Sequence, residues 1–430
     1  MTRLTSIGLV LGAAALCSTH LHAHAAPAAP AHDARTDRLK GLSKADLALL
    51  EPQLQVGPVA LVEFADDDAD ELPAINLAAI VHAPAQALMA LVERPEGYPS
   101  FMHTLDRVEV AQRDGASTTY DWRWNLALLS LQGRNSMTTF PPPPDRADVG
   151  YRTVIDSVSG DLGTGRISLR VLPRSANESL LCISLRLDLR SANYVARQLA
   201  SAARSVNRSA DMALTYAMVL SFREEAERRA GHHAQASAAG GLQKPQLDLK
   251  ALWPLLMRGD LVLLDVTGAR LNRIAAVGVI HQDAALVHKV LLDTEAFGDS
   301  LLPGSEAKVV SRRGAVTIFD WDISLPLIGV SGRMKVSDAD PVVSVDAVDG
   351  AMHGGRWSFE TLPLGKDLTV LSAWASFDLR DTTWFVRGLA NADPGLGHGM
   401  SAASEILLVR GVRTEAVDRA EREAKARKAH

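Results

Sequence analysis

The stretch YDWRWNLALLSLQGR (120–134) recurs as FDWDISLPLIGVSGR (319–333), and this repeat is the strongest indication of the fold in the chain. The offset between the two stretches is 199 residues, and the same offset carries His82 onto His281 without a gap. A second pair, SGDLGTGR and DGAMHGGR, follows at an offset of 190 residues. Matches in register over so long a span indicate that one domain has been duplicated within the chain.

The duplication sets the expected domain boundaries. Between the two copies lies GHHAQASAAGGLQKPQ, whose glycine, alanine and polar residues are typical of a flexible linker. The first copy also contains FPPPPDRAD, whose prolines predict a loop at a hairpin end. The predicted order is a signal peptide (1–25), a flexible N-terminal segment (26–44), a first domain (45–232), a linker (233–246), a second domain (247–422) and a charged tail (423–430).

Apolar periodicity predicts several strands and one long helix in each copy. Tyr120, Trp122 and Trp124 fall on one face of a strand, and the polar residues between them fall on the other. The run 192–229 contains no proline or glycine and carries an apolar stripe at helical spacing, which predicts a long closing helix. Strands are predicted at 75–83, 108–112, 118–126, 132–139, 151–158, 166–172 and 180–189. We therefore expect an α+β fold in which a curved antiparallel sheet wraps around the closing helix.

Three features of the first copy carry a family resemblance: the turn YPSF (98–101), the strand YDWRW (120–124) and the closing helix. They resemble the START/polyketide-cyclase/coenzyme-Q-binding (SRPBCC) superfamily, whose members have helix-grip (START/Bet v 1-like) domains. The resemblance implies two tandem helix-grip domains that enclose a hydrophobic ligand between sheet and helix, and some members are cyclases or aromatases. The second copy departs from the pattern, with FGDS at 297–300 and a closing helix that Pro394 should break or kink.

Composition excludes several classes of protein. The chain has 430 residues, of which 47% are hydrophobic and 22% charged, so collagen-like, disordered and multi-span membrane proteins are disfavoured. A formal charge of −5 and an aromatic content of 5% argue against a nucleic-acid partner. The expected partner is a hydrophobic small molecule. No transmembrane segment is predicted, so any contact with a membrane would be transient.

The N-terminus has the features of an export signal. Arg3 precedes an apolar run from Ile7 to Leu16, and Ala23-His24-Ala25 forms a small-x-small cleavage site. A lipoprotein anchored through Cys17 is the disfavoured alternative, because Leu16 stands where a small residue is needed. We expect a soluble mature protein that is exported to the periplasm after cleavage of a signal peptide.

Aromatic and sulfur-containing side chains expected on the cavity side of the sheet are the candidate ligand-binding residues. They are Tyr98, Phe101, Met102, Tyr120, Trp122 and Trp124 in the first copy, and Phe319, Trp321, Trp357 and Trp374 in the second. His82 and His281, which follow the opening strand of each copy, are candidate polar anchors in the same cavities. The alternative is that each histidine caps the turn after its strand.

Other polar motifs are predicted to be structural. Cross-strand surface pairs are expected between Asp121 and Arg134 in the first copy and between Asp320 and Arg333 in the second. Cys182 lies in an apolar run and is the one cysteine left after export, so a buried, unreactive thiol without a disulfide is expected. No catalytic residues are predicted, since Ser401, His398 and Asp393 match a catalytic triad only in sequence spacing. No metal or cofactor is predicted either.

Three functions remain open at this point. The favoured one is an exported carrier or sensor of a hydrophobic small molecule that is lipid-, sterol-, quinone- or polyketide-like. The second is a polyketide cyclase or dehydratase that would use His82 or His281 as acid or base. The third is a non-catalytic envelope scaffold whose cavities are filled by its own side chains. A large dry cavity would favour the carrier, and titratable groups facing the cavity would favour the enzyme.

Overall fold

A computed structural model gives the fold. It describes residues 39, 41–64, 74–126, 129–188, 192, 204–232, 242–267, 270–296, 305–325 and 328–429. Several predicted features lie outside these residues: the export signal, most of the linker, the start of the first closing helix and FGDS at 297–300. The described residues of both copies belong to one compact unit.

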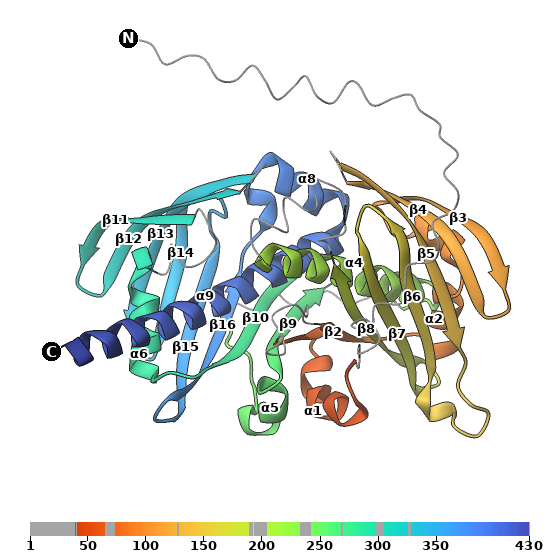
Figure 1. Ribbon diagram of the computed structural model, residues 1–430, viewed down its shortest axis with the longest axis horizontal. Coiled ribbons are helices and arrows are strands. Elements are labelled where there is room, and N and C mark those ends of the chain that lie inside the picture. The colour runs from red at the N-terminus through yellow and green to blue at the C-terminus, as the bar shows by residue number, and fades with distance from the viewer. Residues whose placement is uncertain are drawn as a thin grey trace, which may run out of the picture. The chain divides into compact units, whose positions relative to one another are not determined.

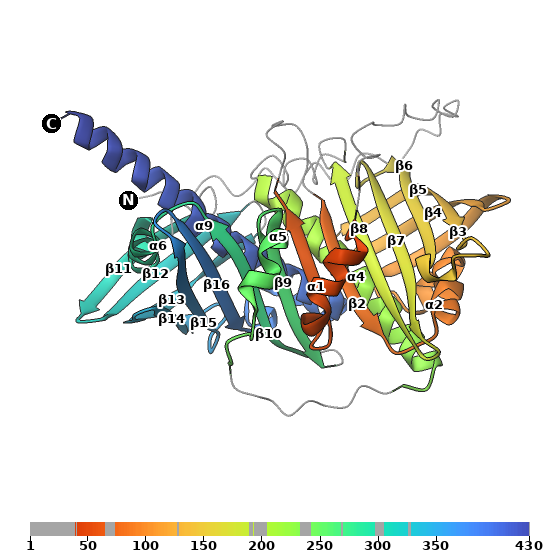
Figure 2. The same cartoon turned by 90° about the horizontal axis from the view of Figure 1, so that it is seen from below.

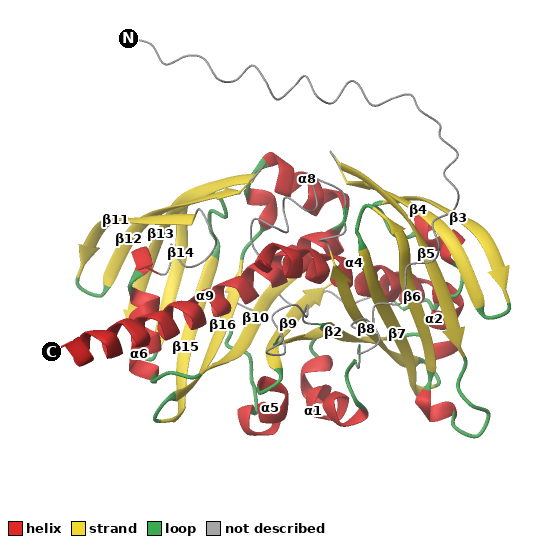
Figure 3. Ribbon diagram, viewed as in Figure 1, coloured by secondary structure: helices red, strands yellow, loops and turns green. Residues whose placement is uncertain are grey.

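The two copies share the same order of strands and main helices, and they differ in their short 3-10 helices and in the closing helix, which is α4 in the first copy and α8 with α9 in the second (Figure 3). The first consists of α1 (Lys44–Leu54), β1 (Val59–Glu63), β2 (Ile75–Val81), α2 (Ala85–Val92), η2 (Pro95–Ser100), β3 (Leu105–Asp114), β4 (Ser117–Leu126), β5 (Leu129–Phe140), η3 (Ala147–Val149), β6 (Tyr151–Gly160), β7 (Thr164–Ser175), β8 (Glu178–Asp188) and α4 (Arg204–Arg229). The second consists of α5 (Leu249–Leu256), β9 (Gly259–Thr267), β10 (Arg270–Ile280), α6 (Ala284–Leu292), β11 (Ser305–Arg313), β12 (Val316–Leu325), β13 (Ile328–Ala339), β14 (Val342–Gly350), β15 (Arg356–Gly365), β16 (Leu368–Ser376), η5 (Leu379–Asp381), α8 (Trp384–Ala392) and α9 (Pro394–Ala429). The predicted strands are present with shifted ends, and the proline-rich stretch forms the loop between β5 and β6.

The sequence analysis missed α1 and β1 and their counterparts α5 and β9. Helix α1 begins at a capping box, in which Ser43 and Asp46 each bond the other's backbone N–H. Strand β1 is the short apolar run VALVE, and β9 begins with a similar run. These strands matter because β1 pairs with β9 in antiparallel register, with Leu61 opposite Leu261. The edge of one copy's sheet is thereby joined to the edge of the other.

Within the described residues the sixteen strands form one antiparallel sheet (Figure 1). Its order is β11-β12-β13-β14-β15-β16-β10-β9-β1-β2-β8-β7-β6-β5-β4-β3, so β9 and β1 lie at its centre. The central strands are covered on both faces. Alternate residues of β1 pack into two separate apolar clusters, one with α4 and α9 and the other with α1 and α5. Figure 2 shows α1 and α5 beside the central strands. Burial on both faces explains why β2 reads as an unbroken apolar run apart from Asn76.

The closing helices differ between the copies, as the sequence predicts. In the second copy α8 ends at Ala392, and α9 begins at Pro394. Asp393 separates them, and its carboxylate accepts hydrogen bonds from the backbone N–H groups of Gly395 and Leu396, which caps α9. Proline at the first helical position is compatible with a helix start. The break predicted at Pro394 is therefore confirmed.

Small residues let α4 and α9 cross closely. A Cβ added to Gly395 would lie 2.7 Å from the Cα of Ala217, and one added to Gly399 would come closer than 3.0 Å to the backbone of Ala213. The two glycines and the two alanines are each four residues apart, so they line up along facing stripes of the two helices. The glycines of GLGHG thus allow the closing helices of the two copies to pack against each other.

Ion pairs also join the two copies. Arg258, just before β9, bonds Asp46 of α1 at 2.8 Å and Glu63 of β1 at 3.1 Å. A second group of ion pairs lies within the second copy. There Asp260 of β9 is fully buried and accepts hydrogen bonds from two arginines of α9, Arg410 and Arg413. A buried carboxylate needs such partners, because its desolvation would otherwise be unfavourable. The central strands, α1 and α9 are therefore held together by charge as well as by packing.

Candidate functional site

The first copy contains an apolar cavity of about 90 Å³ between the sheet and α4. Its lining comes from η2 and the residues after it, from strands β3 to β8 and their turns, and from α4. The lining residues are Tyr98, Met102, Leu105, Tyr120, Trp122, Trp124, Asn135, Ile155, Ser157, Leu162, Gly165, Ile167, Leu187, Leu214 and Met218. Most of these side chains are hydrocarbon or sulfur, so a ligand here would contact mainly apolar surface.

Residues of β4 position the tryptophans of this cavity. Tyr120, Trp122 and Trp124 alternate along the strand, so their side chains share the face that points at α4. Trp122 lies directly opposite Gly133 of β5, and a Cβ on that glycine would lie 2.7 Å from the indole ring. Trp321 and Gly332 repeat this pairing in the second copy. In both copies glycine makes room for an indole that lies over the neighbouring strand.

A short polar network lies inside the first cavity. The indole N–H of Trp122 donates to Oδ1 of Asn135 at 3.2 Å, and Nδ2 of Asn135 donates to the hydroxyl of Tyr120 at 3.2 Å. Burial raises the pKa of Tyr120 to about 12, which keeps its hydroxyl protonated. Tyr98 is also buried, and its hydroxyl donates to the carbonyl of Val92 at 2.6 Å. The polar groups that face this cavity thus include the Tyr120 hydroxyl and the indole N–H of Trp124, which has no partner among the described residues.

The second copy contains a larger cavity, of about 200 Å³, at the equivalent place beneath α9. Its lining residues are Leu291, Thr294, Ser305, Glu306, Ala307, Phe319, Trp321, Asp322, Ile323, Met334, Val336, Val345, Met352, Trp357, Phe359, Ser404, Leu407 and Leu408. Trp357 stacks on Phe377 with ring centroids 5.1 Å apart. Phe319 and Met334 occupy the positions of Tyr120 and Asn135, so the polar network of the first cavity is replaced by apolar groups.

The structure brings together most of the predicted cavity residues. Tyr98, Met102, Tyr120, Trp122 and Trp124 line the first cavity, and Phe319, Trp321 and Trp357 line the second. Phe101 lies beside the first cavity rather than in its lining, where its ring packs against Tyr98 and Phe222. Three candidates lie elsewhere: His82, His281 and Trp374.

The positions of these three residues have simple causes. Trp374 is one residue out of phase with the cavity side of the sheet, because Trp357 lies opposite Ala375 and the tryptophan lies opposite Ser358. It therefore points to the other face. His281 follows β10 directly and is exposed to solvent. His82 follows β2 and lies in a polar cluster outside the cavity.

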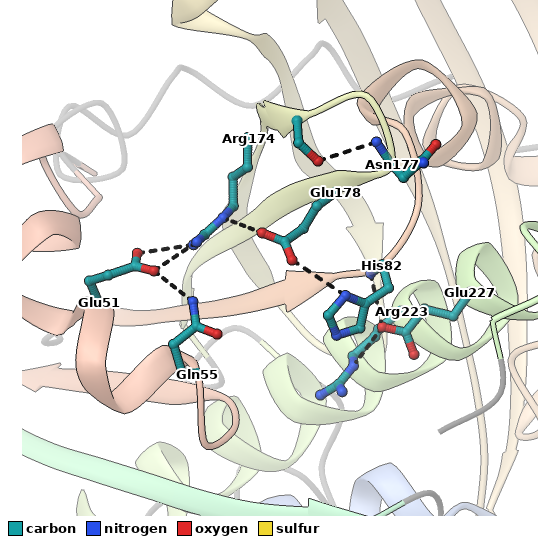
Figure 4. Close-up of polar contacts among 9 residues, drawn as sticks. Glu51, Gln55, His82, Arg174, Asn177, Glu178, Arg223 and Glu227 are labelled. Carbon is teal, nitrogen blue, oxygen red and sulfur yellow. Dashed lines mark hydrogen bonds and ion pairs between the residues drawn. The ribbon is translucent and has the colours of Figure 1, made fainter. Parts of the chain in front are cut away.

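Figure 4 shows the cluster around His82. Its Nδ1 lies 3.4 Å from Glu178, and its backbone N–H donates to Glu227 of α4 at 3.0 Å. Arg174 bonds Glu178 at 2.7 Å and also forms a bidentate pair with Glu51 of α1. This cluster connects α1, β7, β8 and α4. The side chain of His82 therefore belongs to a polar cluster outside the cavity, and the bond to Glu227 is made by its backbone N–H.

The other polar predictions can be compared directly with the structure. Arg134 forms a bidentate pair with Asp121, and Arg333 forms the same pair with Asp320, both across neighbouring strands and partly exposed. Cys182 is buried, and burial raises the pKa of its thiol to about 11, so it is a poor nucleophile near neutral pH. Among the described residues no cluster of side chains is suited to hold a metal ion. Of the described helices, none is both long and apolar enough to span a bilayer.

Sequence reasoning missed the polar residues of the cavity linings, such as Asn135 and Ser157 in the first and Thr294 in the second, and the aliphatic contributions of the closing helices. Asn135 could have been found, because the predicted pair of Asp121 with Arg134 fixes the strand register and puts Tyr120 opposite Asn135. Leu214 and Met218 of α4 could be placed on the helix stripe but not assigned to a cavity. The rotation of α4 about its axis depends on its packing against α9, which sequence periodicity does not specify.

Comparison with known proteins connects the first copy to a family. Residues 81–205 match the family described as polyketide cyclase / dehydrase and lipid transport. The match covers the first copy from the end of β2 into α4 and does not extend to the second copy. No curated protein matches the chain.

Solved structures give similar matches. The di-domain aromatase/cyclase StfQ from the steffimycin biosynthetic pathway is 13% identical, with 80% of this chain and 99% of that chain covered and a TM-score of 0.28. The Zhui aromatase/cyclase from Streptomyces sp. R1128 is 17% identical over 39% of this chain and 98% of that chain, with a TM-score of 0.29. A STAR-related lipid transfer protein from Xanthomonas axonopodis is 10% identical over 40% and 94%, with a TM-score of 0.31. At these identities and TM-scores the matches say nothing about what this chain binds or catalyses.

Proposed function

We propose that this protein binds a small hydrophobic molecule between the sheet and the closing helix, with the main site in the second copy. The observation that carries the proposal is that both copies keep an apolar cavity at the same place, although their lining residues have diverged. A duplicated domain whose cavities served no purpose would gain stability by filling them, because empty apolar space forfeits packing contacts. Retention in both copies therefore supports a binding role over a purely structural one.

Cavity size supports the second copy as the main site. An engineered apolar cavity of about 150 Å³ in another protein stays dry and binds benzene. The second cavity, at about 200 Å³, exceeds that size, whereas the first, at about 90 Å³, needs side-chain movement to admit a comparable ligand. Burying about 250 Å² of apolar ligand surface contributes roughly 6 kcal/mol before the loss of ligand freedom is counted. We expect a small aromatic such as toluene to bind with a Kd on the order of a millimolar or tighter.

The carrier or sensor role is favoured over acid–base catalysis by the same geometry. The enzyme hypothesis relied on His82 or His281 facing a cavity, and neither residue belongs to the lining of either cavity. His82 pairs with Glu178 beside α4, where its backbone N–H also meets Glu227. The titratable groups that line the first cavity are the hydroxyls of Tyr98 and Tyr120, and burial raises the pKa of both. The carboxylates in the lining of the second cavity, Glu306 and Asp322, belong to exposed residues at its rim.

Export to the periplasm is part of the proposal and is supported by the sequence features of residues 1–25 alone. In this role the mature protein would carry its ligand across an aqueous compartment or report its presence. N-terminal sequencing of the protein recovered from a cell-envelope fraction tests this point. A mature chain that begins near Ala26 is expected, and a chain that retains Arg3 or carries lipid on Cys17 would contradict it.

Calorimetric titration with toluene tests ligand binding. Ala307 lines the second cavity, so Ala307→Phe should fill part of that space and abolish the tighter binding event. Val310 lies on the same strand and is about half exposed, so Val310→Phe is a matched control that should leave binding unchanged. Equal toluene affinity in wild type and Ala307→Phe, with both proteins folded, would refute the second cavity as the site. Absence of binding in all three proteins would favour the scaffold hypothesis.

A further inference from the structure

We infer that Asp393 of the second copy restrains one wall of the first cavity, and with it the exchange of ligand there, through a hydrogen bond from Thr104. Thr104 belongs to residues 101–104, called the wall segment below. The part of the inference that concerns ligand exchange rests on the proposed function. The restraint itself does not, because it can be measured without a ligand.

The wall segment connects η2 to β3 beside the first cavity. Met102 within it and Leu105 directly after it belong to the cavity lining. Within the described residues β3 is the last strand of the sheet, so its backbone pairs on one side only, with β4. The backbone of the segment bonds to η2 through the N–H of Met102 at 2.8 Å and to β4 through the carbonyl of Thr104 at 2.9 Å. Any restraint from the opposite side has to come from side chains.

The side chain of Thr104 forms such a restraint with the second copy. Its hydroxyl donates to Oδ2 of Asp393 at 3.3 Å, and each of the two residues is only 3% exposed. Water therefore does not compete freely for this bond. Oδ1 of the same carboxylate accepts from the backbone N–H groups of Gly395 and Leu396, which fixes it at the start of α9. Thr104 is thus attached to a point that α9 holds in place.

His103 supplies a second interaction between the wall segment and the same carboxyl group. Burial raises the pKa of Asp393, and the backbone bonds at the start of α9 and the nearby charge of His103 partly offset this rise. Two consecutive residues of the segment therefore interact with one carboxyl group of the other copy.

The restraint acts in one direction only. At the two offsets of the duplication, Pro303 stands in the position of Thr104 and Ala203 in the position of Asp393. Neither side chain has a polar group, so the first copy cannot form the reciprocal bond to the second. Asp393 is also the residue at which the second closing helix breaks. The break that distinguishes the two copies thus supplies the carboxylate that bonds to the wall of the first cavity.

Hydrogen exchange of the full chain without ligand tests the restraint. Thr104→Val replaces the hydroxyl by a methyl group of similar size, and Thr104→Ser is the matched control that keeps the hydroxyl. The amide of Leu105 bonds to the carbonyl of Met102 at 3.0 Å, so its exchange reports opening of the wall segment. It should exchange about tenfold faster in Thr104→Val, the factor that one buried hydrogen bond contributes, and at the wild-type rate in Thr104→Ser. The amides of β7 should not change.

Asp393→Ser removes the same bond from the other side. Serine is a good N-cap residue, so α9 keeps its start while the shorter side chain withdraws the acceptor from Thr104. Because both changes remove one bond, their effects on the exchange of the Leu105 amide should not add in the double variant. Additive effects in folded variants, or unchanged exchange of this amide in both single variants, would overturn the inference. Asp393→Ser also decides the question if Thr104→Val does not fold.

Toluene tests the consequence for ligand exchange. In a chain with Ala307→Phe, which fills part of the second cavity, the NMR signal of the Trp124 indole N–H reports toluene in the first cavity. Thr104→Val should speed association and dissociation by about tenfold each and leave the Kd nearly unchanged, since the lining is the same. Equal rates in the folded wild-type and variant chains would overturn the control of ligand exchange.

Failure of this inference and failure of the proposed function give different results. Binding of toluene to none of these proteins would overturn the proposed function and the role in ligand exchange together. The exchange of the Leu105 amide would still decide whether Asp393 restrains the wall segment.

Discussion

Glu405 provides a test of how α9 packs over the centre of the sheet. Its side chain is fully buried, and neither carboxylate oxygen has a hydrogen-bond partner in the part of the chain that the structure describes. Burial raises its pKa from the ordinary 4.5 to about 8, because the charged form loses its hydration. The folded protein therefore holds a proton on Glu405 at neutral pH that the unfolded chain releases. The free energy of unfolding should fall as pH rises from about 4.5 to about 8. Above that range the contribution of Glu405 to it should be constant.

The size of this loss of stability follows from the pKa shift of Glu405. A difference of about 3.5 pKa units corresponds to roughly 5 kcal/mol of destabilisation above pH 8, which is an upper bound because local relaxation and water entry reduce it. The variant Glu405→Gln removes the titration and keeps the shape of the side chain. We expect it to match the wild type near pH 4.5 and to be progressively more stable up to pH 8.

Urea unfolding of both proteins at pH 4.5, 6 and 8 measures this difference. Glu415 is a matched control on the same helix, because it is buried but bonded to Arg419 and Arg422. Glu415→Gln should lower stability rather than raise it, since it weakens these charge-assisted bonds. A stability difference between Glu405→Gln and wild type that does not change with pH would refute the burial of an unpaired carboxyl at this position.

Further predictions concern the helix crossing, the surface pairs and the first cavity. Gly399→Ala should destabilise the fold by about 1–3 kcal/mol in thermal unfolding, because its Cβ would meet the α4 backbone, whereas Gly397→Ala on the same helix should be close to neutral. A double-mutant cycle on Asp121 and Arg134 should give a coupling below about 1 kcal/mol, because the pair is partly exposed; a larger value would mean that it is not screened by solvent. Trp122→Ala should weaken ligand binding in the first cavity by about 2 kcal/mol in a titration followed by the NMR signal of the Trp124 indole N–H, and unchanged affinity in a folded variant would exclude this residue from the site.

The amount of fold that the sequence predicts depends on which interactions are local. Alternation along β4 and the repeated Asp–Arg pairs predict the register of the strands around each cavity, and the structure has that register. Pro394 predicts where the second closing helix breaks, because proline acts on its own backbone. In contrast, the pairing of β1 with β9 is a long-range contact between two short apolar runs. No pattern within either run specifies its partner.

The same distinction between local and long-range interactions applies to the residues of the candidate site. The phase of β4 places Tyr120, Trp122 and Trp124 on the cavity face, and this prediction agrees with the lining of the first cavity. Trp374 lies on the other face of β16, which the sequence does not predict, because an aromatic residue in a strand buried on both faces gives no indication of which face it occupies. His82 illustrates a third case: its partners come from β8 and α4, which only the folded chain brings together.

Xenon binding in crystals of the protein would show whether both cavities are open to an apolar molecule, because xenon enters apolar cavities without needing any specific contact. We predict xenon density in the second cavity between Trp321, Phe359 and Leu408, with weaker density in the first cavity beside Trp124. The second site should disappear in Ala307→Phe and remain in Val310→Phe. Crystals in which xenon occupies neither cavity, or in which side chains fill both, would contradict the proposal that this chain binds a hydrophobic molecule between sheet and helix.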